Sequence, residues 1–525
     1  MTLFQTMDSL VQDWSDLFSQ ERTFDRVRRL VYGQLLSPPR HTTTAAICAV
    51  GHQFHDWSAD YRAFSRSPWE PEHLFDRVID RVVRLLPPHP APVIAAMDDT
   101  ACKKSGRRIP GVATVRDPQS PPYHVNLIRG LRFVQASLIV ASLDWQGPAR
   151  SLPVRFEPAP PVAKPKKNAP PQEWDEYKKR KKALSLTQIG LSTVSSLRNA
   201  LDQRPDTKLR QLLVAVDGSY TNKVLLKALP KHTTLIGRIR QDADLHRPLD
   251  TKPNTNGRPR KYGLKAPTPK EVLSDDSIPF EEIPCFAVGE IRDFKVKVLR
   301  PVFWRKAGHD KPLILVVIKP MGYRLRKGSK LLYREPAFLI CTDPNLDLKT
   351  LVQAYLYRWE IEVNHHDEKS IIGVAQAQTR NPQAVDRQPQ LQVAAYSLLL
   401  LASILAHGFQ RTEDYLPLPK WRKTSPRPSA ADLINLLRQQ ILGHIFAADH
   451  EITFDHFDRN PKSDTKLQKL AFNSRIAFLP QNGQPRAAPS FLDVGKIAAD
   501  IHPHTDVPRS KPLPSSLAPV TEVST

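Results

Sequence analysis

The sequence predicts an α/β fold, because apolar strands alternate with helical segments through the middle of the chain. Three segments are predicted to be apolar strands: APVIAAMDD (91–99), RFVQASLIVASLDW (132–145) and QLLVAVDGSYTN (211–222), and the first and the last of them run into aspartates. An amphipathic helix, ALSLTQIGLSTVSSLRNAL, separates the second of them from the third. This order is typical of a sheet that is covered by helices.

Composition changes along the chain predict where one region gives way to the next. Residues 1–88 are predicted to form a helical N-terminal DNA-binding domain, although a plain helical bundle explains the same pattern. The core is expected in two parts, 89–240 and 333–408, which are separated by a β-rich insertion at 241–332. A helical C-terminal region (409–480) and a disordered tail (481–525) complete the expected order.

The charge of the chain favours a polyanionic partner. Its 525 residues include 76 Lys and Arg against 53 Asp and Glu, a formal net charge of +23. Nucleic acid is the first candidate, and an anionic membrane surface is the alternative. We expect no run of about 18 apolar residues and no signal peptide, so the protein is predicted to be cytosolic without a membrane-spanning segment. The four cysteines lack zinc-site spacing and are predicted to be reduced and buried.

The stretch YLYRWEIEVNHHDEK gathers several reactive side chains on a predicted helix that Asp347 caps. At about 100° per residue, Tyr355, Arg358, Glu362 and Lys369 fall within an arc of about 60°. Four different polar groups in one stripe indicate a site, although a solvated face with a Glu–Arg pair is the alternative.

Two strand-terminal aspartates add to this stripe. Open α/β sheets place functional residues at the carboxyl ends of their strands, where Asp98 and Asp217 are expected. Together with Glu362 they supply three oxygen ligands, which suit Mg²⁺ or Mn²⁺ better than zinc. Two such ions about 3.5–4 Å apart can hold a phosphodiester, activate the attacking group and stabilise the leaving oxygen.

With these residues the chain resembles the DDE insertion-sequence transposases. The spacing of Tyr355, Arg358, Glu362 and Lys369 reproduces the Y-R-E-K signature of that family, and Asp98 and Asp217 match its two aspartates. The resemblance covers roughly residues 91–400.

The resemblance implies a ribonuclease H-like mixed-sheet core with two Mg²⁺ ions, for which Mn²⁺ can substitute. It assigns catalysis and metal binding to Asp98, Asp217 and Glu362, and DNA binding to Tyr355, Arg358 and Lys369. The implied reaction is hydrolysis at terminal inverted repeats, followed by transfer of the freed 3′-hydroxyl into target DNA. The implied partner is double-stranded DNA, bound by a homodimer or a higher assembly in the bacterial cytoplasm.

Some choices stay open. Asp99 is the alternative to Asp98 as the first ligand. A transposase-derived DNA-binding protein without catalysis is the rival function, and a structure-selective nuclease is a third.

Further signals carry less weight. His365, His366, Asp367 and Glu368 are interpreted as a polar helix surface rather than a metal cluster, and Trp359 as packed in the core or beside the site. GRPRKYG (257–263) resembles a minor-groove arm. The runs KPKKN and YKKRKK fit either phosphate contacts or a mobile solvated loop.

Overall fold

The computed structural model describes residues 1–117, 126–141, 147–249, 261–307, 311–323, 328–422 and 425–448. The described residues of Met1–Leu416 form one compact unit together with those of 425–448. The second unit, Pro417–Thr424 with Leu479–Thr525, contains described residues only at 417–422. The expected tail at 481–525 and most of GRPRKYG therefore lie outside the described residues.

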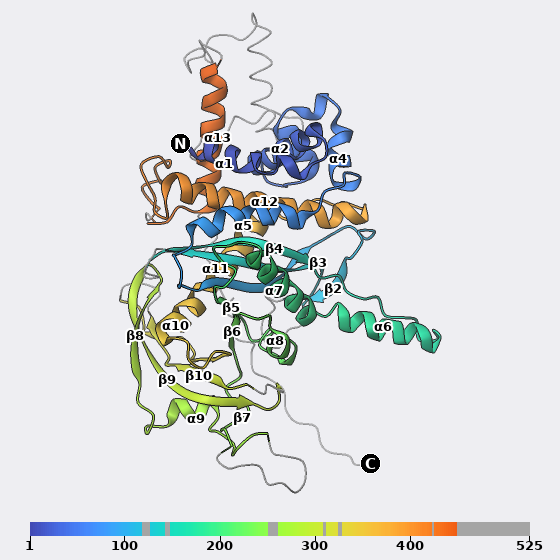
Figure 1. The fold of residues 1–525 in the computed structure, drawn as a ribbon. Helices are drawn as coiled ribbons and strands as arrows, with labels where there is room; N and C mark the ends of the chain where they lie inside the picture. The colour runs from blue at the N-terminus through green and yellow to red at the C-terminus, as the bar shows by residue number, and fades with distance from the viewer. Residues whose placement is uncertain are drawn as a thin grey trace, which may run out of the picture. The chain divides into compact units, whose positions relative to one another are not determined.

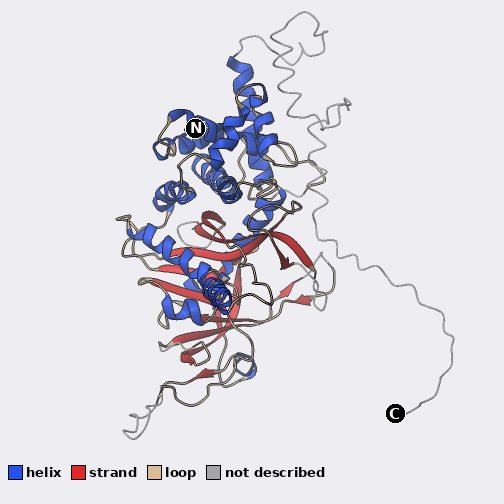
Figure 2. Ribbon diagram, turned by 90° about the vertical axis from the view of Figure 1, so that its right-hand side faces the viewer, coloured by secondary structure: helices blue, strands red, loops and turns tan. Residues whose placement is uncertain are grey.

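A large mixed sheet runs through the first unit (Figures 1 and 2). Its hydrogen-bonded strand order is β2-β3-β1-β5-β6-β13-β10-β9-β7, with β4 paired to β3 and β8 paired to β9. The strands span β1 Val93–Lys103, β2 Ala113–Arg116, β3 Leu127–Ala141, β4 Ala149–Pro158, β5 Leu212–Val216, β6 Thr233–Arg238, β7 Leu245–His246, β8 Glu281–Ala287, β9 Glu290–Trp304, β10 Leu313–Ile318 and β13 Ala337–Cys341. A separate two-stranded sheet pairs β11 Gly322–Tyr323 with β12 Leu332–Tyr333.

The parallel strands lie at the centre of this sheet. β5 is parallel to both β1 and β6, whereas β3 is antiparallel to β1 and β13 is antiparallel to β6. Every residue of β5, LLVAV, is buried, as expected for a strand that is covered on both faces. The α/β class predicted from the sequence is confirmed, and all three strands named for it form.

Helices cover both faces of the sheet and also gather in a separate layer (Figure 2). They span α1 Leu3–Gln12, α2 Glu21–Leu36, α3 Thr43–Ala49, α4 Trp57–Ser65, α5 Pro71–Val82, α6 Pro171–Ala183, α7 Leu186–Asp202, α8 Lys223–Ala228, α9 Pro269–Ser274, α10 Leu348–Tyr357, α11 Trp359–Ser370, α12 Pro382–His407 and α13 Ala430–Ala448. Successive strand side chains point to opposite faces. Accordingly Ile94 and Ala96 of β1 pack with α10 and α11, while Ala95 and Met97 join the core that includes α7 and the N-terminal helices.

The β-rich segment extends the central sheet. β9 pairs with β10, β10 with β13, and β13 with β6, all antiparallel. Residues 241–332 therefore continue the sheet that carries the first part of the core. The segment AFLIC forms β13, which pairs with β6 on one side and with β10 on the other.

The N-terminal helices share one hydrophobic core with the rest of the unit. Residues of α1, α2 and α5 pack with α12 and with the sheet, so 1–88 is helical as predicted but does not form an isolated domain. The expectation of no long apolar run was wrong. By length and composition α12 could cross a membrane, but 89% of its most apolar 18-residue window is buried inside the protein.

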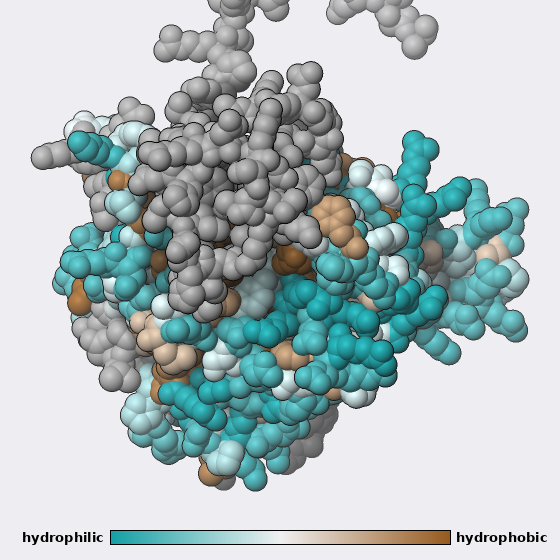
Figure 3. Space-filling model, turned by 90° about the horizontal axis from the view of Figure 1, so that it is seen from above, coloured by the Kyte–Doolittle hydropathy of each residue, from teal (hydrophilic) through white to brown (hydrophobic). Residues whose placement is uncertain are grey.

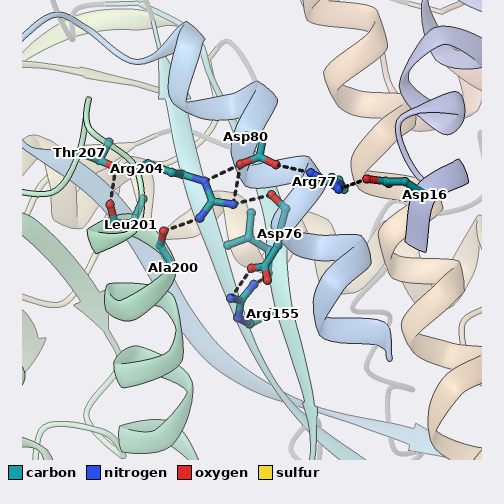
Figure 4. A network of polar contacts seen from close by, with 10 residues as sticks. Asp16, Asp76, Arg77, Asp80, Arg155, Ala200, Leu201, Arg204 and Thr207 are labelled. Carbon is teal, nitrogen blue, oxygen red and sulfur yellow. Dashed lines mark hydrogen bonds and ion pairs between the residues drawn. The ribbon is translucent and has the colours of Figure 1, made fainter. Parts of the chain in front are cut away.

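An ion-pair network fixes α5 onto the core (Figure 4). Arg155 of β4 is 1% exposed and donates from Nη2 to Asp76 Oδ1 at 2.7 Å and from Nε to Ser196 Oγ at 2.8 Å. Arg204, after α7, donates to Asp80 Oδ1 at 2.7 Å. Arg77 pairs with Asp80 and also with Asp16, which lies in the short 3-10 turn Ser15–Leu17 after α1. The network therefore joins the N-terminal helices to β4 and α7.

Replacing Arg155 by Met tests this coupling. Because the variant leaves Asp76 without its buried partner, we expect the free energy of unfolding to fall by about 2–4 kcal/mol, measured by urea denaturation. Arg62→Gln is the control, since the Arg62–Asp56 pair is exposed by 46% and 59%, and its loss is expected to cost about 0.5 kcal/mol. A separate early transition for the N-terminal helices, or equal effects of both variants, would contradict the shared core.

Candidate functional site

The parallel pairing of β1 and β5 brings two aspartates together. Met97 lies opposite Val216 in the register, so the next residue of each strand, Asp98 and Asp217, reaches the same edge of the sheet. Asp98 shares the sheet face of Ile94 and Ala96, which is the face covered by α10 and α11. Asp217 follows the end of β5 as the sequence predicts, whereas Asp98 lies inside β1, at the point where its parallel pairing with β5 ends.

The neighbouring Asp99 points to the opposite face and is fully engaged there. Its Oδ2 accepts from Arg132 Nε at 2.7 Å, and its Oδ1 accepts from the Tyr220 hydroxyl at 2.9 Å. The side chain of Tyr220 is buried between the sheet and α7, where its ring lies against Gly190 and Met97. These bonds give Asp99 a structural role and leave Asp98 on the side of the candidate site.

A tight loop fixes Asp217. Its Oδ1 accepts from the Ser219 backbone N–H at 2.9 Å and from the Ser219 hydroxyl at 2.7 Å, and Thr221 Oγ1 donates to the Asp217 carbonyl at 2.9 Å. Gly237 of β6 is needed beside this loop, because a Cβ there would lie 2.0 Å from Thr221 Oγ1. The Tyr220 N–H also donates to Oδ1, at 3.4 Å, so all three bonds that the loop makes to this carboxylate go to one oxygen and leave Oδ2 for a cation.

The predicted single helix through the Y-R-E-K residues is divided at Arg358. The cap at Asp347 forms as expected, with Asp347 Oδ2 accepting from the Thr350 N–H at 2.9 Å. α10 then ends at Tyr357 and α11 begins at Trp359, with a bond from the Arg358 N–H to the Tyr355 carbonyl that tightens the chain by one residue. The prediction that one continuous helix spans 355–369 was therefore wrong, because two helices meet at Arg358.

The tightened turn places Arg358 between two carboxylates. Its Nη2 lies 2.8 Å from Glu362 Oε1, and its Nη1 lies 3.7 Å from Asp98 Oδ2. Its guanidinium also lies 5.8 Å from the ring centroid of Tyr355. The Arg358 side chain is only 11% exposed, so this charge is held inside the site by the groups around it.

Arg238 is a site residue that the sequence analysis did not identify. It ends β6, next to the strand that carries Asp217, and its charge acts on Tyr355. Burial raises the pKa of Tyr355, while Arg358 and Arg238 oppose that increase. The signal for Arg238 was its place at the end of a third parallel strand, TTLIGR, beside the two strands that end in aspartates.

The electrostatics of Asp98 favour a cation. Burial raises the pKa of Asp98 to about 7, and the charge of Asp217 adds to the increase, while the bond from the Asp99 N–H and the charge of Arg358 oppose it. Two carboxylates side by side in a partly dry site repel one another. A positive group, whether a guanidinium or a divalent ion, relieves that repulsion.

The donor set fits a hard divalent ion, but the three carboxylates do not form a ready three-ligand site. No group of three or more His, Cys, Asp or Glu side chains in the described part of the chain could hold a metal ion. Asp98 and Asp217 supply adjacent oxygen ligands, whereas Glu362 is tied to Arg358. Use of Glu362 as a third ligand requires the Arg358–Glu362 pair to open.

Lys369 lies further along α11 than the other signature residues. It is seven residues beyond Glu362, about 10 Å along a helix, and its charge acts on Cys102 of β1 and on His365. The part of α11 near Lys369 thus follows β1 past the carboxylates. The structure places Tyr355, Arg358 and Glu362 at the aspartates, and Lys369 beside them along the sheet.

The histidines and acids that follow Glu362 are mostly buried, so the interpretation as a polar helix surface was wrong for three of the four. His365, Asp367 and Glu368 are at most 8% exposed, and only His366 is exposed. The Tyr396 hydroxyl donates to Asp367 Oδ2 at 3.0 Å. Burial raises the pKa of Glu368 to about 8 and lowers the pKa of His365 to about 3, so both are neutral near pH 7.

Trp359 and Glu360 lie outside the group of carboxylates. Trp359 is 58% exposed, which excludes the core and leaves a position beside the site as its expected place. Glu360 pairs with Arg427 instead of the site residues. It therefore does not compete with Glu362 for the aspartates.

Comparison with known proteins gives one family. The profile of a family described as DDE superfamily endonuclease matches residues 15–309, more than half of the chain. The match includes Asp98 and Asp217 and ends before Glu362. No curated protein matches the chain.

The two neighbouring aspartates should respond differently to substitution. Asp99→Asn loses charge-assisted bonds with Arg132 and Tyr220, so we expect the free energy of unfolding to fall by about 1–3 kcal/mol. Asp98→Asn removes a carboxylate that repels Asp217 and should change stability less. Urea denaturation of both variants measures the difference, and a larger loss for Asp98→Asn would contradict the assignment of the two faces.

Glu368→Gln should change how stability depends on pH. A carboxyl whose pKa is raised on folding holds its proton in the fold and loses it in the unfolded chain, so wild-type stability falls as pH rises from about 5 to 8, on the order of 1 kcal/mol per unit. The Gln variant lacks this dependence. Its stability relative to wild type should therefore increase across that range, as measured by denaturation at several pH values. Glu173→Gln, on the exposed surface of α6, is the control and should show no such trend.

Proposed function

Since the chain belongs to the DDE superfamily endonucleases, a family of transposase-like nucleases, we propose that it is the transposase of an insertion sequence. In this proposal it hydrolyses phosphodiester bonds at terminal inverted repeats and then joins the freed 3′-hydroxyl to target DNA. The observation that carries the proposal is the pair Asp98 and Asp217 on adjacent parallel strands, with Arg358 bridging Asp98 to Glu362.

The aspartates and the glutamate would hold divalent ions. Bound Mg²⁺, or Mn²⁺ in its place, would activate the attacking hydroxyl or water and stabilise the leaving oxygen. Asp98 and Asp217 provide oxygen ligands from rigid strand ends, and Glu362 provides a third carboxylate from α11. The Asx-type bonds at Asp217 and the β1–β5 register fix the first two in place before substrate arrives.

Arg358 would exchange partners when DNA binds. In the structure its guanidinium neutralises Asp98 and Glu362. A phosphate offers the same planar fork two oxygens, and the transfer frees the carboxylates to act as ligands. Tyr355 and Arg238, which lie beside it, would then hold the DNA backbone by a hydrogen bond and a charge.

The fold supports a ribonuclease H-like core. An antiparallel β-hairpin joins parallel strands in one mixed sheet, and the two aspartates lie on the adjacent parallel strands β1 and β5. We further propose action as a homodimer or higher assembly on DNA, in the bacterial cytoplasm. A transposase-derived DNA-binding protein without catalysis is the alternative, but a protein that only binds DNA does not need a pair of carboxylates placed to bind a cation.

The deciding assay combines purified protein, Mg²⁺ and a duplex that carries the ends of the DNA element encoding the chain. We expect cleavage at those ends and strand-transfer products, resolved on denaturing gels. Glu362→Gln should lower the rate by about 10³-fold or more while DNA binding is kept, because it removes a ligand and not the binding surface.

Glu360→Gln is the matched control, since it changes the same residue type on the same helix but pairs with Arg427 away from the carboxylates. It should cut at close to the wild-type rate. Binding without cutting by the wild-type protein would support the non-catalytic alternative, and equal activity of the two glutamine variants would remove Glu362 from the site.

A further inference from the structure

A strongly basic surface lies next to the candidate site, and the catalytic groups do not include it. We call it the basic arm and define it as residues 103–117, 126–131 and 159–183. The arm holds thirteen exposed Lys and Arg against four Asp and Glu, so a large share of the net charge of +23 lies in about a tenth of the chain. The exposed cations are Lys103, Arg107, Arg108, Arg116, Arg129, Lys164, Lys166, Lys167, Lys178, Lys179, Arg180, Lys181 and Lys182.

Contacts join the parts of this arm. The Ala159 N–H donates to the Arg132 carbonyl at 2.8 Å, which starts the linker 159–170 alongside β3. Lys164 of the linker then lies with its Nζ 5.7 Å from the Trp174 ring centroid on α6. The β2–β3 hairpin, the linker and α6 therefore form one continuous surface.

Helix α6 has no buried residue and projects from the rest of the unit (Figures 1 and 3). The run YKKRKK therefore forms part of an exposed helix and not a loop. A helix without a buried apolar face gains little from packing. Its projecting surface is hydrophilic in Figure 3, and its last two turns carry the cations.

Two arginines of the β2–β3 hairpin lie on the same face of the sheet as Asp98. Asp98 pairs with Gln135 across β1 and β3, and Arg129 lies six residues from Gln135 on the same strand, so both share one sheet face. Arg116 of β2 faces the same way, because the β2–β3 register pairs Thr114 with Arg129. Six residues of strand span about 20 Å, roughly six base pairs of duplex. Lys369 lies near Cys102, between Asp98 and the hairpin end.

We propose that the basic arm binds the phosphate backbone of duplex DNA that extends from the scissile bond. This inference rests on the proposed function, because the cleaved phosphodiester fixes where the duplex begins. Cations at intervals along one sheet face match a repeating line of phosphates, and α6 adds a further contact at the end of that line. The arm reads no base sequence and contributes affinity and position.

The lysines of α6 allow a selective test. At about 100° per residue, Lys178, Lys179 and Lys182 fall within an arc of about 100° on the helix, away from the partly buried ring of Tyr177. The variant Lys178→Gln, Lys179→Gln, Lys182→Gln removes this face. The control removes three exposed cations that precede the parallel strands, at the opposite edge of the sheet: Arg84→Gln, Lys208→Gln, Lys231→Gln.

Binding of the full-length protein to labelled duplexes is measured by fluorescence anisotropy at several salt concentrations, in EDTA so that no cleavage occurs. We expect the slope of log affinity against log salt to fall by about 2–3 for the α6 variant, and by less than about 1 for the control. Asp175→Asn, which removes the carboxylate 3.0 Å from Lys178, should tighten binding. Thermal unfolding should stay unchanged in all three, because these side chains are exposed.

Separate outcomes distinguish this inference from the function on which it rests. An unchanged slope for the α6 variant, or an equal fall for the control, overturns the arm even if the wild-type protein cuts DNA. A fall in slope without cleavage by the wild-type protein keeps the arm and removes the transposase proposal. If the α6 variant lowers the salt slope equally on a random duplex and on a duplex with the element ends, the arm binds any duplex. If the slope falls only on the duplex with the element ends, the arm binds the element end. Loss of binding to phosphatidylserine vesicles, with DNA binding intact, overturns the proposal in favour of a membrane.

Discussion

The structure of the site depends on the repulsion between two carboxylates that the sheet forces together. The register of β1 and β5 fixes Asp98 beside Asp217, and the hydrophobic residues that precede them fix the register. A one-residue slip of either strand would turn its carboxylate to the other face, so the two charges cannot separate without disrupting the core. Arg358 compensates the charge of Asp98 from the turn between α10 and α11, where it also pairs with Glu362.

Much of this arrangement follows from local sequence. A short apolar run that leads into Asp predicts a strand that carries a carboxylate, and both aspartates were identified in that way, although β1 continues beyond Asp98. The capping residue of α10 was predicted correctly from its oxygen and its place before an apolar helix.

The remaining features depend on contacts between distant residues. Periodicity alone gives no sign of the turn at Arg358, because that residue keeps helical backbone angles, with φ −53° and ψ −31°. His365 and Glu368 were assigned to the surface by residue type, yet both are buried against strands that a single sequence does not place beside them. For the same reason α12 was underestimated. Its glutamines and Pro389 lower the apparent hydrophobicity of the sequence, yet nearly all of α12 is buried in the core that it shares with α1, α2 and α5.

The way the β-rich segment joins the sheet has a consequence for engineering. Since β10 pairs with β13 along five residues, excising residues 241–332 would expose the hydrophobic edge of β13, in the core that packs against α10 and the start of α11. Shortened versions of this protein should therefore be built by trimming its loops, with the β9–β10–β13 ladder left whole as the scaffold for the third carboxylate.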